Sequence, residues 1–363
     1  MPRRLLLLSL ATLGLLLGSA HAQSPDARVI RGDLAVSDDG ATVATSTGTG
    51  TLLLWNADSW TLLRRHVADR SMVFGFDFTD DSRYVSFGTK DGRLGVLEVA
   101  TGRVVLDLQE RDGSVSATRF GPDDQLFAAG QGRSLTSYNW RTGESLQRYD
   151  LGRDTLPDGR PLVVEDFEVL PEQGWLLIAR FDQQARLMDI ATGEVFRTWR
   201  NKRRPRDGNR NVKDVAVGLD SRTGFFAGVG GEVIAVDLVT GARLDSVRAH
   251  PDFVSDLELS ADGSLLAAND LDGNTTLIDP RTRSIVRRTA QDGSFQSGRL
   301  LFAVAFRPGT HELITGGIRM PIVVWNASTG ERQQTIASLP GTASRLPCPK
   351  DFVTEPSGQA SMR

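Results

Sequence analysis

Short runs of alternating apolar and polar residues, each ending in a polar turn, recur along this chain. Examples are VSDLELSADG at 254–263, GFDFTDDS at 75–82, SATRFGPDD at 116–124 and FAVAFRPGT at 302–310. Alternation with a period of two is the pattern of a β-strand with one buried face, and the Asp and Gly that follow suit a tight turn with positive φ. The pattern predicts a strand and turn that are repeated along the chain.

A second recurring element gives the period of the repeat. It is a large apolar residue, then Asn, Asp or Glu, and shortly afterwards Thr-Gly, as in RLMDIATG at 186–193 and IAVDLVTG at 234–241. The apolar anchors are Trp55, Leu97, Tyr138, Met188, Val236, Ile278 and Trp325, with separations of 42, 41, 50, 48, 42 and 47 residues. Anchors at this spacing predict seven structural repeats.

Each repeat is interpreted as four short strands, with the anchor on the third. The anchor strands are apolar on consecutive residues, which implies that both faces of each small sheet are covered. One such sheet cannot bury its own faces, whereas seven packed into a ring can. The sequence therefore predicts an all-β fold, a seven-bladed β-propeller of four-stranded antiparallel blades over residues 34–338.

The repeats resemble those of the WD-repeat β-propellers, and AHPDFVSDLELSADGSLLAANDLDGNTTLIDPRT at 249–282 shows the likeness best. The resemblance implies a structural network in which a His before the first strand, an Asp between the second and third strands and a Trp on the third strand are joined. The matching blade positions are His66 with Asp91, His250 with Asp272, and Trp55 and Trp325 in blades that lack the His. The resemblance also implies a role in protein binding.

The two ends of the predicted propeller are compatible with more than one way of closing the ring. Family members often close the ring by lending an N-terminal strand to the last blade, and ARVIRG at 27–32, within the N-terminal segment 23–33, could serve in that way or extend the first strand of blade one. ERQQTIAS at 331–338 already has the pattern of the last blade's fourth strand. Residues 339–363 are rich in Pro, Ser and Gly, and we expect a disordered tail there.

The first 22 residues have the pattern of a cleaved signal peptide. Arg3 and Arg4 precede the apolar stretch LLLLSLATLGLLL, whose 13 residues are short for a membrane span of ~20, and AHA at 20–22 precedes the expected new N-terminus, Gln23. The mature chain would carry 40 basic and 45 acidic residues, a net charge of −5. Only four of the 42 basic residues are Lys, which is typical of a GC-rich genome and favours a bacterial, periplasmic or secreted protein.

Motifs for catalysis are lacking in the sequence. We find no G-x-S-x-G, no H-E-x-x-H, no zinc spacing of Cys and His, and no phosphate-binding Gly-rich loop. A convergent set of acids, a His or a metal trio at channel positions would favour an oxidoreductase or hydrolase that uses the central channel, and the sequence shows us none. We therefore expect no cofactor and no catalytic residues.

A weaker likeness points to a second propeller group. MDIATGEVFRTW at 188–199 and VDLVTGARL at 236–244 resemble the corner motif of quinoprotein-like propellers, in which a Trp after the Gly docks on the neighbouring blade. That resemblance implies, as the alternative function, a periplasmic quinoprotein-like propeller with an enzymatic role, a quinone-dependent oxidoreductase, or a role in envelope assembly.

One basic segment stands apart from the repeats. RTWRNKRRPRDGNR at 197–210 holds seven cationic residues: Arg197, Arg200, Lys202, Arg203, Arg204, Arg206 and Arg210. It is either a solvated insertion or a docking site for an acidic partner, a protein or an acidic polymer of the envelope, because Arg binds carboxylate and phosphate bidentately. Aromatic residues for stacking on bases are sparse here, so sequence-specific nucleic-acid binding is not expected.

Together these features predict an exported, monomeric, WD-repeat-like scaffold that binds a partner without catalysis and has no membrane span after signal cleavage. The loops that connect the strands would form the binding rim, because loops on a rigid scaffold can vary without unfolding it.

Overall fold

The structure is a computed structural model, and it describes residues 30–336 apart from 111–112, 132–133, 153–154, 156–158, 160–161, 202–211, 292, 294–298 and 319. The predicted leader 1–22 and tail 339–363 lie outside the described residues. The described residues form strands and contain no helix. A membrane-spanning helix is therefore not found among them.

The described strands form seven four-stranded antiparallel sheets, and in each sheet the strands follow one another in sequence order. The first four blades are built from β1 Ile30–Val36, β2 Thr42–Thr47, β3 Thr51–Asn56, β4 Leu62–Val67; β5 Val73–Phe78, β6 Tyr84–Thr89, β7 Arg93–Glu98, β8 Val104–Gln109; β9 Val115–Phe120, β10 Gln125–Gly130, β11 Ser134–Asn139, β12 Glu144–Asp150; β13 Val164–Leu170, β14 Trp175–Arg180, β15 Gln184–Asp189, β16 Val195–Arg200. The other three are built from β17 Val212–Val217, β18 Thr223–Gly228, β19 Glu232–Asp237, β20 Arg243–Arg248; β21 Asp256–Leu259, β22 Leu266–Asn269, β23 Asn274–Asp279, β24 Ser284–Ala290; β25 Leu300–Phe306, β26 Glu312–Ile318, β27 Met320–Asn326, β28 Arg332–Ile336.

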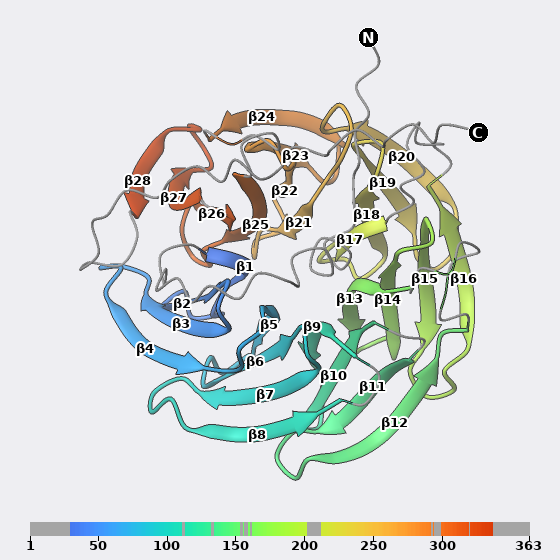
Figure 1. Ribbon diagram of the computed structural model, residues 1–363. Helices are drawn as coiled ribbons and strands as arrows, with labels where there is room; N and C mark the ends of the chain where they lie inside the picture. The colour runs from blue at the N-terminus through green and yellow to red at the C-terminus, as the bar shows by residue number, and fades with distance from the viewer. Residues whose placement is uncertain are drawn as a thin grey trace, which may run out of the picture.

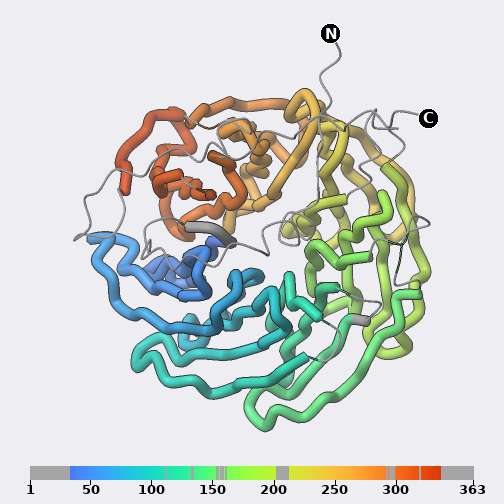
Figure 2. The backbone as a smooth tube through the Cα atoms, in the orientation of Figure 1, coloured from blue at the N-terminus to red at the C-terminus, as the bar shows by residue number. Residues whose placement is uncertain are grey.

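The blades stand in a ring around a central axis (Figure 1). The first strand of every blade faces the axis and the fourth lies at the outer edge; the tube in Figure 2 shows the same order from blue to red. The predicted seven-bladed propeller is confirmed, and each of the seven anchors lies on the third strand of its blade.

Packing between blades explains why the middle strands are apolar on consecutive residues. All six residues of β2 and of β6 are buried, while β4 is exposed along most of its length. Seven of the eight apolar clusters of the described residues join two neighbouring blades. One of them holds Phe226 and Ile234 of the fifth blade together with Leu177 and Leu187 of the fourth. A blade thus buries both faces because it has a neighbour on each side.

The two anchor tryptophans satisfy their indole N–H groups inside their own blades. Trp55 Nε1 donates to Thr45 Oγ1 at 2.9 Å, and Trp325 Nε1 donates to Thr315 Oγ1 at 2.9 Å. In both cases the threonine lies on the second strand, beside the anchor strand. A buried donor left unpaired costs about 1–3 kcal/mol, so this pairing helps to fix the position of each ring.

Among the described strands, the ring closes without an exchanged strand. β1 pairs with β2 of its own blade, β28 pairs with β27, and each sheet therefore consists of consecutive strands. Of the two uses considered for the N-terminal segment, the structure has the one that extends the first strand of blade one. Arg307 of the seventh blade crosses the seam, donating from Nε to the carbonyl of Gly40 at 2.7 Å and pairing with Asp58.

The recurring Thr-Gly turn has a packing role. The outer-strand arginines Arg197 and Arg287 each donate to a carbonyl in the turn of the next blade, at 2.7 Å in both cases. The glycine of that turn has φ of 79° at Gly241 and 78° at Gly330, and an added Cβ would meet the arginine Cδ at 2.9 Å and 2.6 Å respectively. Glycine is required there by the left-handed backbone and by the close approach of the neighbouring blade.

We predict that Trp325→Ala lowers the free energy of unfolding by about 3–5 kcal/mol, because it opens a cavity between blades at a residue that is 5% exposed. The control is Leu219→Ala, at a side chain that is 65% exposed, which we expect to change stability by less than about 0.5 kcal/mol. Urea unfolding of the three proteins is the measurement, and an equal loss in both variants would contradict this account of the core.

Candidate functional site

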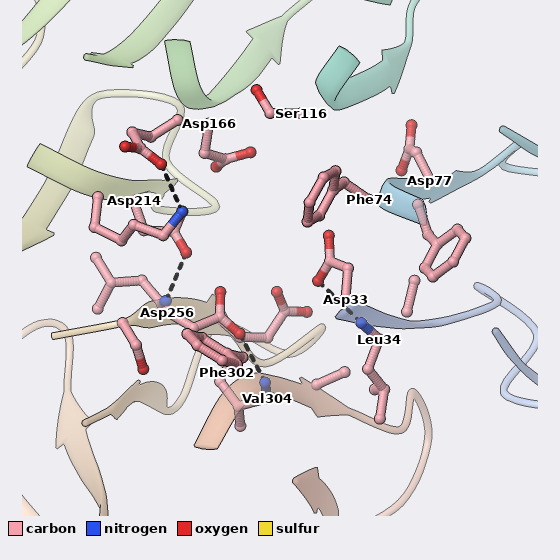
Figure 3. A pocket seen from close by; sticks show the side chains of 18 of the residues that line it. Asp33, Leu34, Phe74, Asp77, Ser116, Asp166, Asp214, Asp256, Phe302 and Val304 are labelled. Atoms are coloured by element: carbon pink, nitrogen blue, oxygen red, sulfur yellow. Dashed lines mark hydrogen bonds and ion pairs between the residues drawn. The ribbon is translucent and has the colours of Figure 1, made fainter. Parts of the chain in front are cut away.

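The first strands of the seven blades enclose a cavity on the ring axis (Figure 3). Its volume is about 420 Å³, within the range of sites for small ligands. The lining comes from β1, β5, β9, β13, β17, β21 and β25 and from the turns next to them. All seven blades therefore contribute residues to this common space.

Alternation along the first strands aims acidic side chains into this cavity. Phe167 and Leu257 are buried between blades, whereas the residues on either side of each lie on the opposite face: Asp166 and Glu168, Asp256 and Glu258. The pairing of β13 with β14 is irregular just before Asp166, and that of β17 with β18 just before Asp214. Irregularities of this kind re-aim the side chains that follow them.

Several of these carboxyl groups link one blade to the next. Asp77 Oδ2 accepts a hydrogen bond from the backbone N–H of Phe120 at 2.6 Å. Asp256 Oδ2 accepts one from Val304 at 2.7 Å, and Asp214 Oδ2 accepts one from Leu257 at 2.9 Å. The acceptor and the donor belong to successive blades each time, so these bonds tie the inner ring together. Asp33 is bonded within its own strand, to the N–H of Leu34 at 2.9 Å.

Basic side chains offset only part of this charge. The described lining holds nine acidic residues and three basic ones. Arg119 donates to Asp166 at 2.9 Å and to Glu168 at 3.3 Å, and Lys213 donates to Glu165 at 2.8 Å. Arg119 and Lys213 are thus paired with acids of the fourth blade.

Burial makes several of these acids hold their protons more tightly. Desolvation raises the pKa of Asp77 to about 7 and that of Asp256 to about 8. It also raises the pKa values of Asp166, Asp214 and Glu258 well above the ordinary range for a carboxyl group. Neighbouring carboxyls act in the same direction, because two like charges close together cannot both ionise easily.

Apolar side chains gather at one end of the cavity, where Lys90, Ser114 and Gln131 also line it. Met72, Phe74, Val163, Phe302 and Ile318, here named the apolar mouth, lie at the starts of the first strands or at the adjacent end of a second strand. Leu300 pairs with Ile318, which places these ends side by side. Figure 3 shows Phe74 and Phe302 reaching into the same space as the carboxyl groups. A ligand that enters at this end would pass aromatic rings before it meets the acids.

The expectation that no acids converge on the channel is wrong. Asp33, Asp166, Asp214 and Asp256 each stand directly before a buried apolar residue of a first strand, in GDLAV, EDFEV, KDVAV and SDLEL. The repeated Asp-apolar pair was the available signal. It was missed because the residues are far apart in sequence, and only the closed ring brings them together. In the described part of the chain, no three of these or other acids, histidines or cysteines are placed to hold a metal ion.

The histidine positions are arranged differently from the expected network. His250 is buried, and its Nδ1 lies 3.3 Å from Oδ2 of Asp270, two residues before the Asp272 that the repeat pattern indicated. His66 lies on β4 against the ring of Phe87, with the centroids 5.7 Å apart. Burial, and then the charge of Arg93, lowers the pKa of His66. Its Nε2 is buried without a hydrogen-bond partner among the described residues, so no bond there joins it to Asp91.

The predicted basic segment is only partly described. Arg197 holds the turn of the next blade, and Arg200 is exposed at the end of β16. Lys202, Arg203, Arg204, Arg206 and Arg210 lie outside the described residues, so docking of an acidic partner there stays a prediction. Trp199, between the two described arginines, is buried, and its Nε1 donates to the carbonyl of Gly241 on the next blade at 2.9 Å.

Two proteins of known identity are similar to the chain. Apoptotic protease-activating factor 1 of Homo sapiens is 23% identical over 279 residues, which cover 75% of this chain and 21% of the human protein. A guanine nucleotide-binding protein subunit beta of Zea mays is 21% identical over 272 residues, which cover 74% of this chain and 71% of the maize protein. The chain thus spans about a fifth of the first relative and about seven-tenths of the second. No family model matches the chain.

The weak homology to these WD-repeat proteins and the seven four-stranded blades together define the chain as a WD-repeat-like β-propeller.

The raised pKa values generate a prediction for stability. A carboxyl whose pKa is higher in the folded state stabilises the fold at low pH, and that contribution is lost as pH rises through the folded-state pKa. With the pKa of Asp77 near 7 and that of Asp256 near 8, the free energy of unfolding should fall between pH 5.5 and pH 8, by up to about 1.4 kcal/mol per pH unit for each proton involved, and level off above pH 8.

Asp256→Asn should make this fall shallower, because the amide cannot ionise and its oxygen can still accept the N–H of Val304. Asp123→Asn, at an exposed turn residue, is the control and should keep the wild-type slope. Urea unfolding at a series of pH values provides the measurement. A wild-type stability that rises over this range, or parallel profiles for all three proteins, would contradict the role assigned to the channel acids.

Proposed function

We propose that this chain is an exported, non-catalytic interaction platform, and that its apolar mouth and acidic channel receive a basic segment of a protein partner. The observation that carries the proposal is the channel lining, with nine acidic residues against three basic ones beside Phe74 and Phe302. A guanidinium or ammonium group is attracted to carboxylates and to aromatic faces alike.

The architecture favours binding over catalysis. Three channel carboxylates accept backbone hydrogen bonds from the next blade, and this role holds the ring together without any turnover. The closed ring keeps the channel preformed, so a partner would pay little for ordering it. The relatives support a protein as the partner class, because WD-repeat proteins serve as interaction scaffolds.

The binding proposal is tested with a hexa-arginine peptide blocked at both ends. We expect the double variant Phe74→Ala/Phe302→Ala to bind it about tenfold more weakly than wild type, a loss of about 1.4 kcal/mol. Binding to wild type should weaken as salt is raised, because the attraction is electrostatic. Isothermal titration calorimetry gives both quantities.

The matched control is Leu219→Ala, which removes an exposed apolar side chain that is absent from the channel lining. Equal affinities for wild type, the double variant and this control would place the basic ligand somewhere other than the channel. A hexa-glutamate peptide provides the opposite charge, and tighter binding of that peptide would favour the acidic partner expected from the basic segment 197–210.

The proposal that the protein is exported rests on the leader-like sequence of residues 1–22. The proposed location is the periplasm or the extracellular medium. We expect protein isolated from its native host to begin at Gln23. Intact mass and N-terminal sequencing measure this directly. If the form beginning at Met1 is the sole species found, the proposal of export with cleavage fails.

An enzyme that uses the channel is the alternative, and the converging acids are the observation in its favour. Asp77 and Asp256, with pKa values of about 7 and 8, would be protonated near neutral pH and could act as general acids. A quinoprotein-like enzyme would carry a coloured cofactor. Visible absorbance or stoichiometric metal in protein purified from its host would favour this alternative, and their absence together with peptide binding would favour the platform.

A further inference from the structure

Three carboxyl groups on consecutive blades lie side by side in the channel: Asp166 on β13, Asp214 on β17 and Asp256 on β21. All three line the same cavity, and Asp214 Oδ2 accepts the N–H of Leu257, the residue next to Asp256. The carboxyl of Asp214 lies near enough to those of Asp166 and Asp256 for each pair to influence one another's pKa. They form a row that spans the fourth, fifth and sixth blades, seen along one side of the cavity in Figure 3.

Hydrogen bonds along a row of carboxyl groups require bound protons. Two ionised carboxylates have only acceptor oxygens, so a hydrogen bond between them requires one of the pair to carry a proton. Asp214 has its two oxygens occupied by the N–H groups of Leu257 and Val215, which keeps the group fixed between its neighbours. Oδ2 of Asp166 is buried and receives no hydrogen bond from the described residues in the absence of such a shared proton.

The charges around the row do not replace these protons. From β9, Arg119 pairs with Asp166 and Glu168, and from β17, Lys213 pairs with Glu165. The other strands that face the row contribute further acids, Asp33 from β1, Asp77 from β5 and Glu258 from β21. In the described part of the chain, no lysine or arginine forms an ion pair with Asp214 or Asp256. Lys213 also attracts Asp214 and Asp166 through its charge, and Lys90 lines the same cavity. A shared proton is the further counter-charge that we assign to the row.

We propose that a cationic ligand entering the channel takes the place of the protons shared along the Asp166–Asp214–Asp256 row, so that binding releases protons and strengthens as pH rises. This inference rests on the proposed function and adds its regulation. The physical cause is that a positive charge beside a carboxyl favours the ionised form. In balance, the cation enters, the row loses protons to the solvent, and no other bond is made or broken.

The coupling has a definite sign and range. Release of one proton on binding makes the affinity rise tenfold for each pH unit, as long as the free protein holds that proton and the complex does not. The pKa of about 8 for Asp256 places the upper end of this range near pH 8. The row is tightly coupled, so the protons belong to the set of carboxyls and not to one member.

The experiment uses the whole mature chain and the blocked hexa-arginine peptide, whose own charge does not change between pH 6 and 9 because Arg stays protonated. Calorimetric titrations at pH 7.5 in phosphate and in Tris, which differ in ionisation enthalpy, give the number of protons released. We expect about one or more per peptide, and an affinity that rises roughly tenfold from pH 6.5 to pH 7.5.

Asp214→Asn removes the middle of the row and should reduce both the proton release and the pH dependence. If that variant does not fold, Asp256→Asn carries the test, since its amide oxygen can still accept the N–H of Val304. The matched control, Asp123→Asn, makes the same chemical change at an exposed turn and should behave as wild type.

Infrared spectroscopy supplies a readout that needs no ligand. The free protein at pH 7 should show the C=O band of protonated carboxyl groups, which weakens when the peptide is added and in Asp214→Asn. Absence of this band in free wild type overturns the inference whatever the peptide does.

The two proposals fail in different ways. Peptide binding with no proton release and no pH dependence would overturn the coupling and leave the cation-binding platform intact. No peptide binding at any pH from 6 to 9 would overturn the proposed basic partner, and the coupling with it. Proton release that is equal in wild type and Asp214→Asn would also overturn the assignment to this row.

Discussion

Apolar packing between adjacent blades is the interaction on which the other features of this protein depend. A four-stranded sheet of six-residue strands has too little surface to bury itself, and each one here gains a buried face from each neighbour. The seam between the seventh and first blades follows the same rule, with Ala303 and Ile322 packed against Leu34 and Trp55. Because no strand is exchanged there, side-chain packing and Arg307 carry the closure.

The same packing creates the chemical character of the channel. Closing the ring forces seven first strands together around one axis, and their inward residues are acidic in most blades. Some of these acids serve the ring by accepting N–H groups from the next blade. The carboxyl groups are thereby gathered in a poorly solvated space, where Arg119 and Lys213 pair with some of them and burial raises the pKa of others. The acids that hold neighbouring blades together are therefore the same groups to which we assign the binding of a cationic partner.

The two charged features of the chain have opposite signs. We propose that the acidic channel binds basic groups, while the basic sequence 197–210 would attract acidic ones. A rigid ring can present both at once, since its loops and its axis are set by separate parts of each blade. The relatives share this type of scaffold at about one-fifth identity, so the fold is what they have in common with the chain, and the channel residues must be judged by their own chemistry.

The sequence alone determined the number of blades, the four strands in each and the strand that carries each anchor. These features could be predicted because period-two alternation and turn residues, such as the glycine of Thr-Gly, depend on the local backbone conformation. The pairing of His250 with Asp270 instead of Asp272, and the seam without an exchanged strand, were decided by tertiary structure. So was the convergence of acids from Asp33 to Glu258. Contacts of this kind join residues that lie one or more repeats apart, and their distances are defined only when every blade has packed on its neighbours and the ring has closed.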